Sequence, residues 1–546
     1  MVMNLSIGRG VSAALSVWTP LARRLMATGL LGLLVLALAG CGALPPRQAL
    51  LASHAFTDAQ QTSLAHIARA SLPPDVASDV SGFRLLPSGE QSFDGRLALA
   101  ERAERSIDAQ YYELHADPAG AKFLRALRDA AARGVRVRLL VDDFHAADVY
   151  PMLSTLAAHP GVQVRIFNPL LARSGAPLHR MLLSVRELAR VNHRMHNKLF
   201  LADNQVALYG GRNIADEYFY RSAKANFVDQ DVLSVGAVVR DLSASFDRYW
   251  NSEQVWSLQQ LVPPTGDTAA MQLQFDAISR PMADALPPLN LVPLDPLRQT
   301  SIRLQLAEGR LLQHPGRARV HDDPPEKVDQ PTVPDQPSAA MRGKLAVIAS
   351  AREEVVIVNP YILPGPIGLK LMAEAARQGT RVLIVTNSLD STDEPLVHRA
   401  YSRYRAAMLK LGMKLYEFSP ELARKSGTFG DYQHATLRLH AKVAVVDRRW
   451  MVVGSVNLDA RSALLNTELG VTIDCPVLAL QALGLISGDG YASMYRLAMA
   501  PDQERLTWLA QDPELGSRVF VDEPGLHWWL DFKMWLQSLL ISDESL

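Results

Sequence analysis

Hydrophobic and polar positions follow the same order of helical and strand-like periods in two parts of the chain. In the first part, helical patterns at 94–104 and 118–133 are each followed by a β-prone segment, at 106–114 and 135–141. The second part repeats this order, with helices expected at about 341–352 and 366–377 and strands at 355–363 and 381–386. Helices that alternate with strands at this spacing favour an α/β fold with parallel strands. The repeat indicates two similar halves.

The stretches outside these patterns have a different composition. Residues 41–80 are polar and irregular, and we interpret them as an N-terminal linker. Residues 315–337 hold six prolines together with charged residues, a composition typical of an exposed connector. We therefore expect the following division of the chain: a leader at 1–40, the linker at 41–80, a first lobe at 81–285, a connector at 286–340 and a second lobe at 341–546.

The N-terminal 40 residues have the pattern of an export signal. Arg23 and Arg24 precede an apolar run of 16 residues that ends in Leu-Ala-Gly before Cys41. A spanning helix needs roughly 20 apolar residues, so this run is short for one. The pattern resembles a bacterial lipoprotein signal, which implies a chain lipidated at Cys41. Because Gly42 follows instead of Asp, we expect an outer-membrane anchor that faces the periplasm, with a short uncleaved anchor as the alternative.

The C-terminal segment 527–540 carries three of the eight tryptophans at roughly helical spacing. A core helix is the simpler interpretation. The alternative is a helix that lies in a membrane interface, with its aromatic side chains at the level of the lipid headgroups.

Charge and cysteine content exclude several classes of protein. Lys and Arg together number 56, as do Asp and Glu, so the net charge is zero and a uniformly basic nucleic-acid binder is disfavoured. Cys41 and Cys475 are the two cysteines of the sequence. They can form neither a disulfide framework nor a cysteine-rich zinc site.

A short motif, His-x-Lys-x4-Asp, occurs once in each half. Composition alone predicts it roughly 0.02 times in a chain of this kind, so two copies in register with a duplicated scaffold are not chance. In each copy a Gly, a Gly or Ser, and an Asn follow the histidine at the same three distances. The first copy comprises His196, Lys198, Asp203, Gly210, Gly211 and Asn213, and the second comprises His440, Lys442, Asp447, Gly454, Ser455 and Asn457.

These residue types suit attack on a phosphodiester. Each histidine shares a strand face with its lysine, whereas the aspartate has the opposite parity and is expected to be structural. One imidazole would attack phosphorus and form a phosphohistidine, and the other would protonate the leaving alcohol and later deprotonate the acceptor. The two lysines, with Asn213, Ser455 and Asn457, would hold the non-bridging oxygens. Since the lysines supply positive charge, we expect no metal ion and no cofactor.

A catalytic imidazole needs an acceptor for its second nitrogen. Glu468 follows His440 by 28 residues and Asp231 follows His196 by 35, so each is expected to orient the histidine of its own half. The alternative for each is a solvated or ion-paired carboxylate. Four further residues flank the motifs, either at the edge of the cleft or as structural groups: His193, Arg194, His434 and Arg438.

The two motifs resemble the signature of the phospholipase D superfamily. The sequences at 194–198 and 210–216 are similar to those of bacterial cardiolipin synthases, particularly the C type, and 457–462 with 466–468 matches the second half of that family. The resemblance implies two α/β/α lobes packed pseudo-symmetrically around one active-site cleft, and two-step transfer of a phosphatidyl group. It also implies that His196 is the nucleophile and His440 the acid and base; the residues alone do not distinguish this assignment from its reverse.

Three other functions share these residues. Water could accept the phosphatidyl group, which would make the protein a hydrolase that releases phosphatidic acid. The same set cleaves nucleic-acid phosphodiesters, although the neutral charge disfavours a nuclease and we expect no nucleic-acid partner. A non-catalytic lipid-binding relic is disfavoured because no motif residue is missing. The expected partners are phospholipids and, through Cys41, a membrane; the sequence carries no signal for or against a protein partner.

Overall fold

The computed structural model describes residues 44–528 except for 185–186, 290–293, 331, 334–335, 427–434, 503, 513 and 527. The predictions for the leader 1–40, for Cys41, for His434 and for all of 527–540 but Trp528 therefore concern residues outside the described ranges.

The strands fall into two lobes and one pair that crosses between them. In the first lobe they are β1 (Val80–Leu86), β2 (Ser106–Tyr111), β3 (Arg136–Asp142), β4 (Val162–Phe167), β5 (Leu199–Ala202), β6 (Val206–Gly210), β8 (Asp231–Gly236) and β9 (Val255–Ser257). In the second they are β10 (His314–Asp322), β11 (Glu354–Val358), β12 (Arg381–Asn387), β13 (Lys414–Phe418), β15 (Val443–Val446), β16 (Trp450–Gly454), β17 (Leu469–Asp474), β18 (Met494–Met499), β19 (Leu506–Asp512) and β20 (Gly516–Phe520). The crossing pair is β7 (Ala225–Val228) and β14 (Thr436–Leu439).

Helices cover both faces of these strands. The first lobe and its continuation contain α2 (Ser63–Ala70), α3 (Gly89–Arg102), α4 (Pro118–Ala132), α5 (Tyr150–Leu156), α6 (Pro177–Leu183), α7 (Leu188–Val191), α8 (Ala237–Trp250), α9 (Leu258–Leu261), α10 (Thr268–Asp284) and α11 (Ile302–Ala307). The second lobe contains α12 (Ala339–Ala349), α13 (Gly365–Arg377), α14 (Pro395–Ser402), α15 (Arg405–Lys410), α16 (Pro420–Ser426) and α17 (Pro476–Ile486). Shorter helical turns are η1 (Ala59–Gln61), η3 (Asp216–Phe219), η4 (Pro325–Asp329), η5 (Arg461–Leu465) and η6 (Gly488–Ser493).

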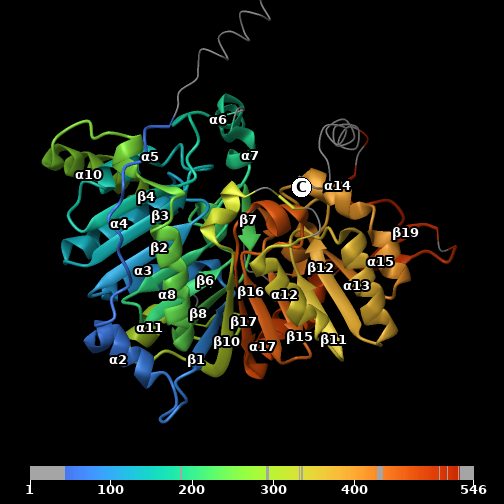
Figure 1. Cartoon of the computed structure of the whole chain (residues 1–546). Coiled ribbons are helices and arrows are strands. Elements are labelled where there is room, and N and C mark those ends of the chain that lie inside the picture. The colour runs from blue at the N-terminus through green and yellow to red at the C-terminus, as the bar shows by residue number, and fades with distance from the viewer. Residues whose placement is uncertain are drawn as a thin grey trace, which may run out of the picture.

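Within the described residues, 18 strands form one sheet that runs through both lobes (Figure 1). At its centre β1 pairs antiparallel with β10, and Ser81 lies opposite Gly316. Outward from β1 the order is β8-β6-β5-β2-β3-β4-β9, and outward from β10 it is β17-β16-β15-β11-β12-β13-β18. The two orders are the same, so a pseudo-twofold axis passes between β1 and β10. The three strands β2, β3 and β4 run parallel, as do β11, β12 and β13.

Three large apolar clusters and a small one around Ala340, Met341 and Val456 stabilise this arrangement. One lies between the first-lobe strands and α3, α4 and α5, and another lies under α15 in the second lobe. The third contains side chains of both lobes, such as Phe83 and Val471, beneath α8 and α17. Because this shared cluster continues from one lobe into the other, the lobes form one core there.

The elements predicted from the two repeated patterns are confirmed. The four expected helices correspond to α3, α4, α12 and α13, and the four expected strands to β2, β3, β11 and β12, with ends that differ by a few residues. The ends have local causes. Asp117 caps the start of α4 by accepting a hydrogen bond from the Gly120 amide, and Gly134, with φ of +92°, follows its end.

Two segments differ from the sequence-based expectation. The stretch 41–80, expected to be an irregular linker, contains α2, whose Leu64 and Ile67 are buried in the first-lobe core. The Pro-rich connector, expected to be exposed, contains β10, which pairs with β1 and β17 and joins the lobes. The side chains of β10 alternate between partly buried and exposed over most of its length. A strand with this pattern can pair between the two lobes although it carries charged residues.

Candidate active site

The two motif histidines lie where short backbone pairings cross between the lobes. The strand β14 pairs in parallel with β7, and the His440 amide donates to the Val228 carbonyl at 2.8 Å. On the other side of the pseudo-twofold axis, Met195 pairs in parallel with Thr467, and the His196 amide donates to the Thr467 carbonyl at 2.9 Å. Each histidine therefore lies beside the residue that follows this contact in the other lobe, which is Asp229 after Val228 and Glu468 after Thr467.

That next residue is a carboxylate in both cases. The Nδ1 of His196 lies 3.0 and 3.1 Å from the two oxygens of Glu468, and the Nδ1 of His440 lies 2.7 Å from Asp229 Oδ2. The expectation that Glu468 and Asp231 orient the histidines of their own halves is wrong. Glu468 orients the histidine of the first lobe, and the carboxylate on His440 is Asp229. When each Nδ1 donates to its carboxylate, Nε2 is left as the nitrogen with a free lone pair.

Asp229 and Glu468 are equivalent positions of the repeat. In β8, Asp231 pairs with Gly210, and in β17, Gly470 pairs with Gly454. Each orienting carboxylate stands two residues before that pairing. A comparison of the two strands in the sequence, instead of a count from the histidines, would have identified Asp229.

Asp231 has a structural role in the first lobe. Its Oδ2 accepts hydrogen bonds from the Ser92 hydroxyl at 2.6 Å and from Arg96 at 3.0 Å, and Arg212 lies 3.6 Å away. All four side chains are buried, so these contacts offset the cost of burying the charges.

The motif lysines have matching geometry in the two lobes. The Nζ of Lys198 donates to the carbonyl of His196, and the Nζ of Lys442 donates to the carbonyl of His440, each at 2.7 Å. Each ammonium group has donors left over for an anionic substrate. Burial lowers the pKa of Lys198 to about 7, with Glu468 acting in the opposite direction, and burial also lowers the pKa of Lys442.

The residues expected to hold phosphate oxygens have different surroundings. The Ser455 hydroxyl donates to Glu468, and both amide hydrogens of Asn213 have protein acceptors, Glu113 at 3.1 Å and Tyr218 at 2.8 Å. These two side chains therefore position other groups of the site. Asn457 is buried and its Oδ1 has no hydrogen-bond partner, so among the three it is the one with unused capacity.

The motif aspartates are structural, as the sequence predicted, although each lies in the turn that follows its strand, β5 or β15, and not on the strand itself. Asp203 accepts hydrogen bonds from the amides of residues 104, 105 and 106, at 2.7 to 3.1 Å. Asp447 accepts from the amides of 352, 353 and 354, at 2.8 to 2.9 Å. Both aspartates have a positive φ in a strand turn, and they fix the start of β2 and of β11 to that turn. Neither carboxylate contacts its motif histidine.

A second pair of equivalent side chains holds each segment that leads into a histidine. At the end of β3, Asp142 accepts from the Met195 amide at 2.8 Å and forms a buried ion pair with Arg194 at 2.7 Å. At the end of β12, Asn387 exchanges two hydrogen bonds with the backbone of Leu439, at 2.8 and 2.9 Å. Arg194 is therefore a structural residue and not a cleft-edge group, and the sequence did not single out Asp142 or Asn387.

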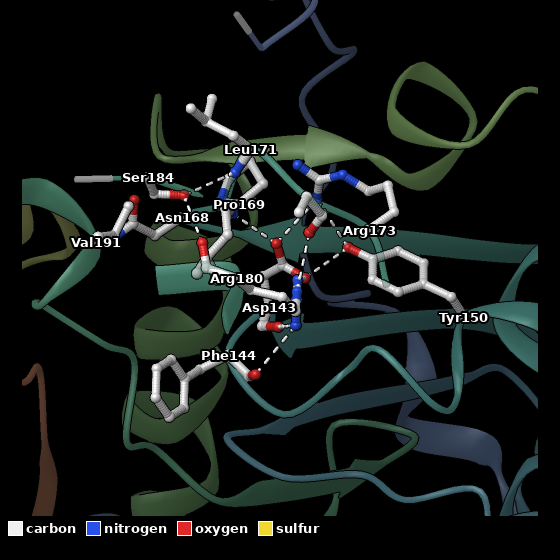
Figure 2. Close-up of polar contacts among 12 residues, drawn as sticks. Asp143, Phe144, Tyr150, Asn168, Pro169, Leu171, Arg173, Arg180, Ser184 and Val191 are labelled. Carbon is white, nitrogen blue, oxygen red and sulfur yellow. Dashed lines mark hydrogen bonds and ion pairs between the residues drawn. The ribbon is translucent and has the colours of Figure 1, made fainter. Parts of the chain in front are cut away.

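The neighbouring Asp143 fixes the loop above this end of β3 (Figure 2). Its carboxylate accepts from Arg180 at 2.6 Å, Tyr150 at 2.7 Å, the Leu170 amide at 2.6 Å and Arg173 at 2.9 Å. Arg180 also donates to the carbonyls of 143 and 144, so α6 is tied to the strand end. The loop and α6 lead directly to α7 and the first motif.

The other flanking residues do not reach the histidine pair through any described hydrogen bond. His193 Nδ1 contacts the Ala189 carbonyl at 2.5 Å, whereas Arg438 Nε has no partner. Tyr112 and Tyr218, which the sequence did not indicate, pack edge-on against His196 and His440, with ring centroids 5.1 and 5.3 Å apart. Their rings limit how each imidazole can turn.

The electrostatics of the site favour neutral imidazoles and ionised Glu468. Burial lowers the pKa of His196, against the opposing effect of Glu468, and burial lowers the pKa of His440 well below its ordinary value. The charges of Lys442, Lys198 and His196 add to the effect on His440, so both halves contribute to one site. Burial alone would raise the pKa of Glu468, but His196 and Lys198 outweigh it and the pKa is lowered.

In the part of the chain that the structure describes, no group of three or more His, Cys, Asp and Glu residues could hold a metal ion. Cys475, the cysteine within that part, is buried at the start of α17. Lys198 and Lys442 each stand two residues after a motif histidine.

Comparisons with known proteins show which proteins the chain is similar to. A family model described as cardiolipin synthase, PLD-like domain, matches residues 97–250 and 345–484. Cardiolipin synthase C of Escherichia coli K12 is 32% identical over 452 residues, which cover 82% of this chain and 93% of that protein. Cardiolipin synthase 2 of Staphylococcus epidermidis RP62A is 26% identical over 386 residues, which cover 70% of this chain and 63% of that protein. The crystal structure of phosphatidylserine synthase from Haemophilus influenzae Rd KW20 matches with a TM-score of 0.51 at 14% identity, covering 88% of this chain and 95% of that one.

Proposed function

The chain belongs to the PLD-like cardiolipin synthase family, and from this premise we propose that it makes cardiolipin from phosphatidylglycerol and a second phospholipid, by transferring the phosphatidyl group of one lipid to the headgroup hydroxyl of phosphatidylglycerol. The observation that carries the proposal is the crossed pair of contacts, His196 with Glu468 and His440 with Asp229. Together they present two oriented imidazoles at one site.

In the first step the Nε2 of His196 attacks the phosphorus of the donor lipid. A nitrogen–phosphorus bond forms, the bond from phosphorus to the oxygen of the leaving headgroup alcohol breaks, and His440 gives that oxygen its proton. Because the bound phosphodiester is anionic, it raises the pKa of His440 relative to the free enzyme and favours the protonated acid.

In the second step His440, now neutral, takes the proton of the acceptor hydroxyl. The acceptor oxygen attacks phosphorus, the bond to His196 breaks, and the neutral imidazole returns. Lys198 and Lys442 face the increase in negative charge on the non-bridging oxygens in both steps. Glu468 stabilises the positive charge that His196 carries while it is phosphorylated.

Product analysis tests this proposal. Purified protein is incubated with labelled phosphatidylglycerol, with and without phosphatidylethanolamine and with and without a chelator, and the lipids are identified by mass. We expect cardiolipin in every arm that contains donor and acceptor, with the chelator included. Phosphatidic acid alone would identify a hydrolase, and no lipid product would contradict the proposal and favour the nuclease alternative.

Substitution of the histidines tests the mechanism. His196→Ala and His440→Ala are each expected to lower kcat by at least about 10³-fold, since each imidazole has a separate role in nucleophilic or acid–base catalysis. The trapped phosphoenzyme should map to His196. A phosphoryl group on His440 would reverse the assignment, and near-normal turnover of either folded variant would contradict the two-histidine mechanism.

We also propose that Cys41 is lipidated and that the protein is anchored in the outer membrane, facing the periplasm. The leader pattern supports this address. Arg47 donates to the carbonyls of 252 and 255, beside the carboxyl end of β4, so the first described residues lie at the same end of the first-lobe strands as the motif segment. An anchor there would keep the site near the lipid surface.

Among the residues that the structure describes, no helix combines the length and the apolar composition that a bilayer crossing requires.

The address is tested at the mature N-terminus by mass spectrometry. We expect a chain that begins at a diacylated and N-acylated Cys41, whose several acyl chains suffice for stable anchoring. Cys41→Ser should leave the longer precursor. An unmodified Cys41 in the wild type would contradict the lipoprotein proposal without affecting the active-site argument.

A further inference from the structure

We propose that an apolar cavity in the second lobe binds one acyl chain of the phospholipid substrate. The cavity has a volume of about 900 Å³, which lies in the range of roughly 300–1,000 Å³ that is usual for ligand sites. This inference rests on the proposed function, because it assumes that the substrate is a phospholipid. It adds a location for the part of the substrate that the catalytic groups do not touch.

The cavity lies between α12 and α13, over the strands β11 and β12. Its walls are mostly aliphatic, and they include Met341, Leu345, Ile348, Ile362, Leu371 and Met372. Such a lining offers few hydrogen-bond partners for a polar ligand but suits a hydrocarbon chain, whose transfer from water is favourable for each methylene group.

The equivalent region of the first lobe is filled by side chains that the second lobe lacks. There, three aromatic rings fill the region between the equivalent helix α4 and the sheet: Phe123 lies 5.8 Å from Tyr111 and 6.0 Å from Phe200, measured between ring centroids. Strand register and the glycines that follow α4 and α13 align the two lobes. Under that alignment the second lobe has Asn359, Gly368 and Ala444 in place of Tyr111, Phe123 and Phe200.

The helix that covers the cavity, α13, is less buried than its counterpart in the first lobe. Whereas α4 buries eight side chains or glycine positions, α13 buries none. Ile367 and Leu371 of α13 line the cavity and are still 48% and 42% exposed. Their apolar surface is therefore available to an occupant and also to the lipid surface from which an occupant would come.

Part of the cavity lining is adjacent in the chain to residues of the catalytic site. Leu458 and Asp459, which line the cavity, directly follow Asn457 of the second motif. Leu458 is held by a backbone bridge to Ile362 and accepts the Leu363 amide at 2.8 Å. The lining also includes Asn192, which precedes the first motif in the chain. Arg461 donates to its side-chain oxygen at 3.1 Å and to its carbonyl at 3.0 Å. An acyl chain that enters the cavity beside these residues would belong to a lipid whose phosphodiester is bound in the catalytic cleft.

Chain-length dependence tests the proposal with the full-length protein. Met372→Trp introduces an indole into the cavity, and Lys370→Trp, on the exposed side of the same helix, is the matched control. Transfer is measured with dipalmitoyl and with dihexanoyl phosphatidylglycerol in mixed micelles. Met372→Trp is expected to lower kcat/KM by about tenfold or more for the long chains, since several methylene groups lose their contacts, and to leave the short-chain rate within about twofold.

Three results are decisive in this assay. Equal long-chain rates for Met372→Trp and Lys370→Trp would overturn the acyl-chain proposal while the proposed function stands. A parallel loss with both chain lengths in a folded Met372→Trp enzyme would also overturn it, because the effect would then act on the headgroup chemistry. A wild type without transfer to either lipid would instead contradict the proposed function.

Photocrosslinking gives a readout that does not depend on turnover. Phosphatidylglycerol with a diazirine at the end of one acyl chain is bound to His196→Ala protein, irradiated and mapped by mass spectrometry. We expect labels on α12 and α13, and their loss in His196→Ala/Met372→Trp. Labels confined to other surfaces, or no cavity label because residues 527–546 of the chain itself fill the space, would overturn the proposal.

Discussion

At the residue scale, the central feature is that each lobe supplies the carboxylate that orients the histidine of the other lobe. Asp229→Asn and Glu468→Gln keep the shape of each side chain but remove its charge, so the imidazoles lose the acceptor that fixes their tautomer. We expect kcat to fall by about 10²- to 10⁴-fold in each variant, with the fold retained by circular dichroism.

Asp231→Asn is the matched control for this prediction. Asp231 stands two residues from Asp229 but binds Arg96 and Ser92, away from both imidazoles. Its substitution should lower the free energy of unfolding by about 3–5 kcal/mol because buried arginines lose their charge partner. A larger loss of kcat from Asp231→Asn than from Asp229→Asn would contradict the assignment of the orienting group.

A pH profile follows from the buried cations and imidazoles. The pKa of Lys198 is about 7 in the free protein, so its charge is lost as the pH rises through that value. The pKa of His196 lies below the ordinary range, so the nucleophile stays neutral until the pH falls below that range. We expect kcat/KM, which reports the free enzyme, to be highest on the acid side of pH 7 and to fall above it, as His440 loses the proton that it donates and Lys198 loses its charge.

Lys198→Arg provides the check on this profile, because a guanidinium stays charged throughout the range. The part of the alkaline decline that Lys198 causes should disappear, even if the maximal rate falls, and the part that His440 causes should remain. In the wild type, kcat should also hold to higher pH than kcat/KM, because bound phosphate raises the pKa of the lysine. An alkaline limb at the same pH in wild type and Lys198→Arg would assign it to another group.

The sequence predicted the reacting residues better than the residues that orient them. His196, Lys198, His440 and Lys442 were identifiable because a motif repeats in register. The residues Asp229, Asn387 and Asp142 act through pairings between segments distant in the chain, so no local spacing indicated them. The Asp-x-Asp sequence at 229–231 also offered two carboxylates, which are distinguished by the register of β8 and by its alignment with β17.

At the element scale, the Asp143 network makes a testable claim about α6. Arg180→Met removes a fully buried partner of Asp143, and we expect the free energy of unfolding to fall by about 3–5 kcal/mol because the carboxylate is left buried without its main counter-charge. Proteolysis within 168–184 should become faster. Arg173→Met removes a partner that is 22% exposed and should cost less, so equal losses would contradict the ranking.

Elements with a clear period were predictable, and elements defined by their partners were not. The helices α4 and α13 have apolar stripes and glycine stops that are visible in the sequence. The strand β10 carries Arg317, Arg319 and His321 among flanking prolines, a pattern that favoured a connector. Its strand conformation depends on hydrogen bonds to β1 and β17 on both sides. The short helix α2 likewise depends on burial against the first lobe.

At the scale of the whole molecule, the continuous sheet predicts coupled unfolding of the lobes. Met451 is buried in the cluster that both lobes share, and Met408 is buried in the outer cluster of the second lobe. Each change to alanine should cost about 2–5 kcal/mol. In hydrogen exchange, Met451→Ala should speed exchange in β1 and β8 of the first lobe as well as in β16 and β17.

Met408→Ala is the control, and its effect should be largest in α15 and β13. Calorimetry of the wild type should show one transition, because unfolding of either lobe exposes the shared core. Two well-separated transitions, or a Met451→Ala effect restricted to the second lobe, would contradict the coupling.

The seam between β1 and β10 has a consequence for how the two lobes can differ. If two identical chains met at such a seam, every substitution would occur twice, and a hollow made on one side would also be made on the other. Here a single chain provides both sides, so each side can change independently. The first lobe has aromatic side chains beneath the well-buried helix α4, whereas the second has open volume beneath α13, which has no buried residues. The covalent link between the halves thus allows a symmetric pair of histidines in a molecule whose lobes differ. The interior of the first lobe is filled by its own side chains, and the second lobe contains a cavity.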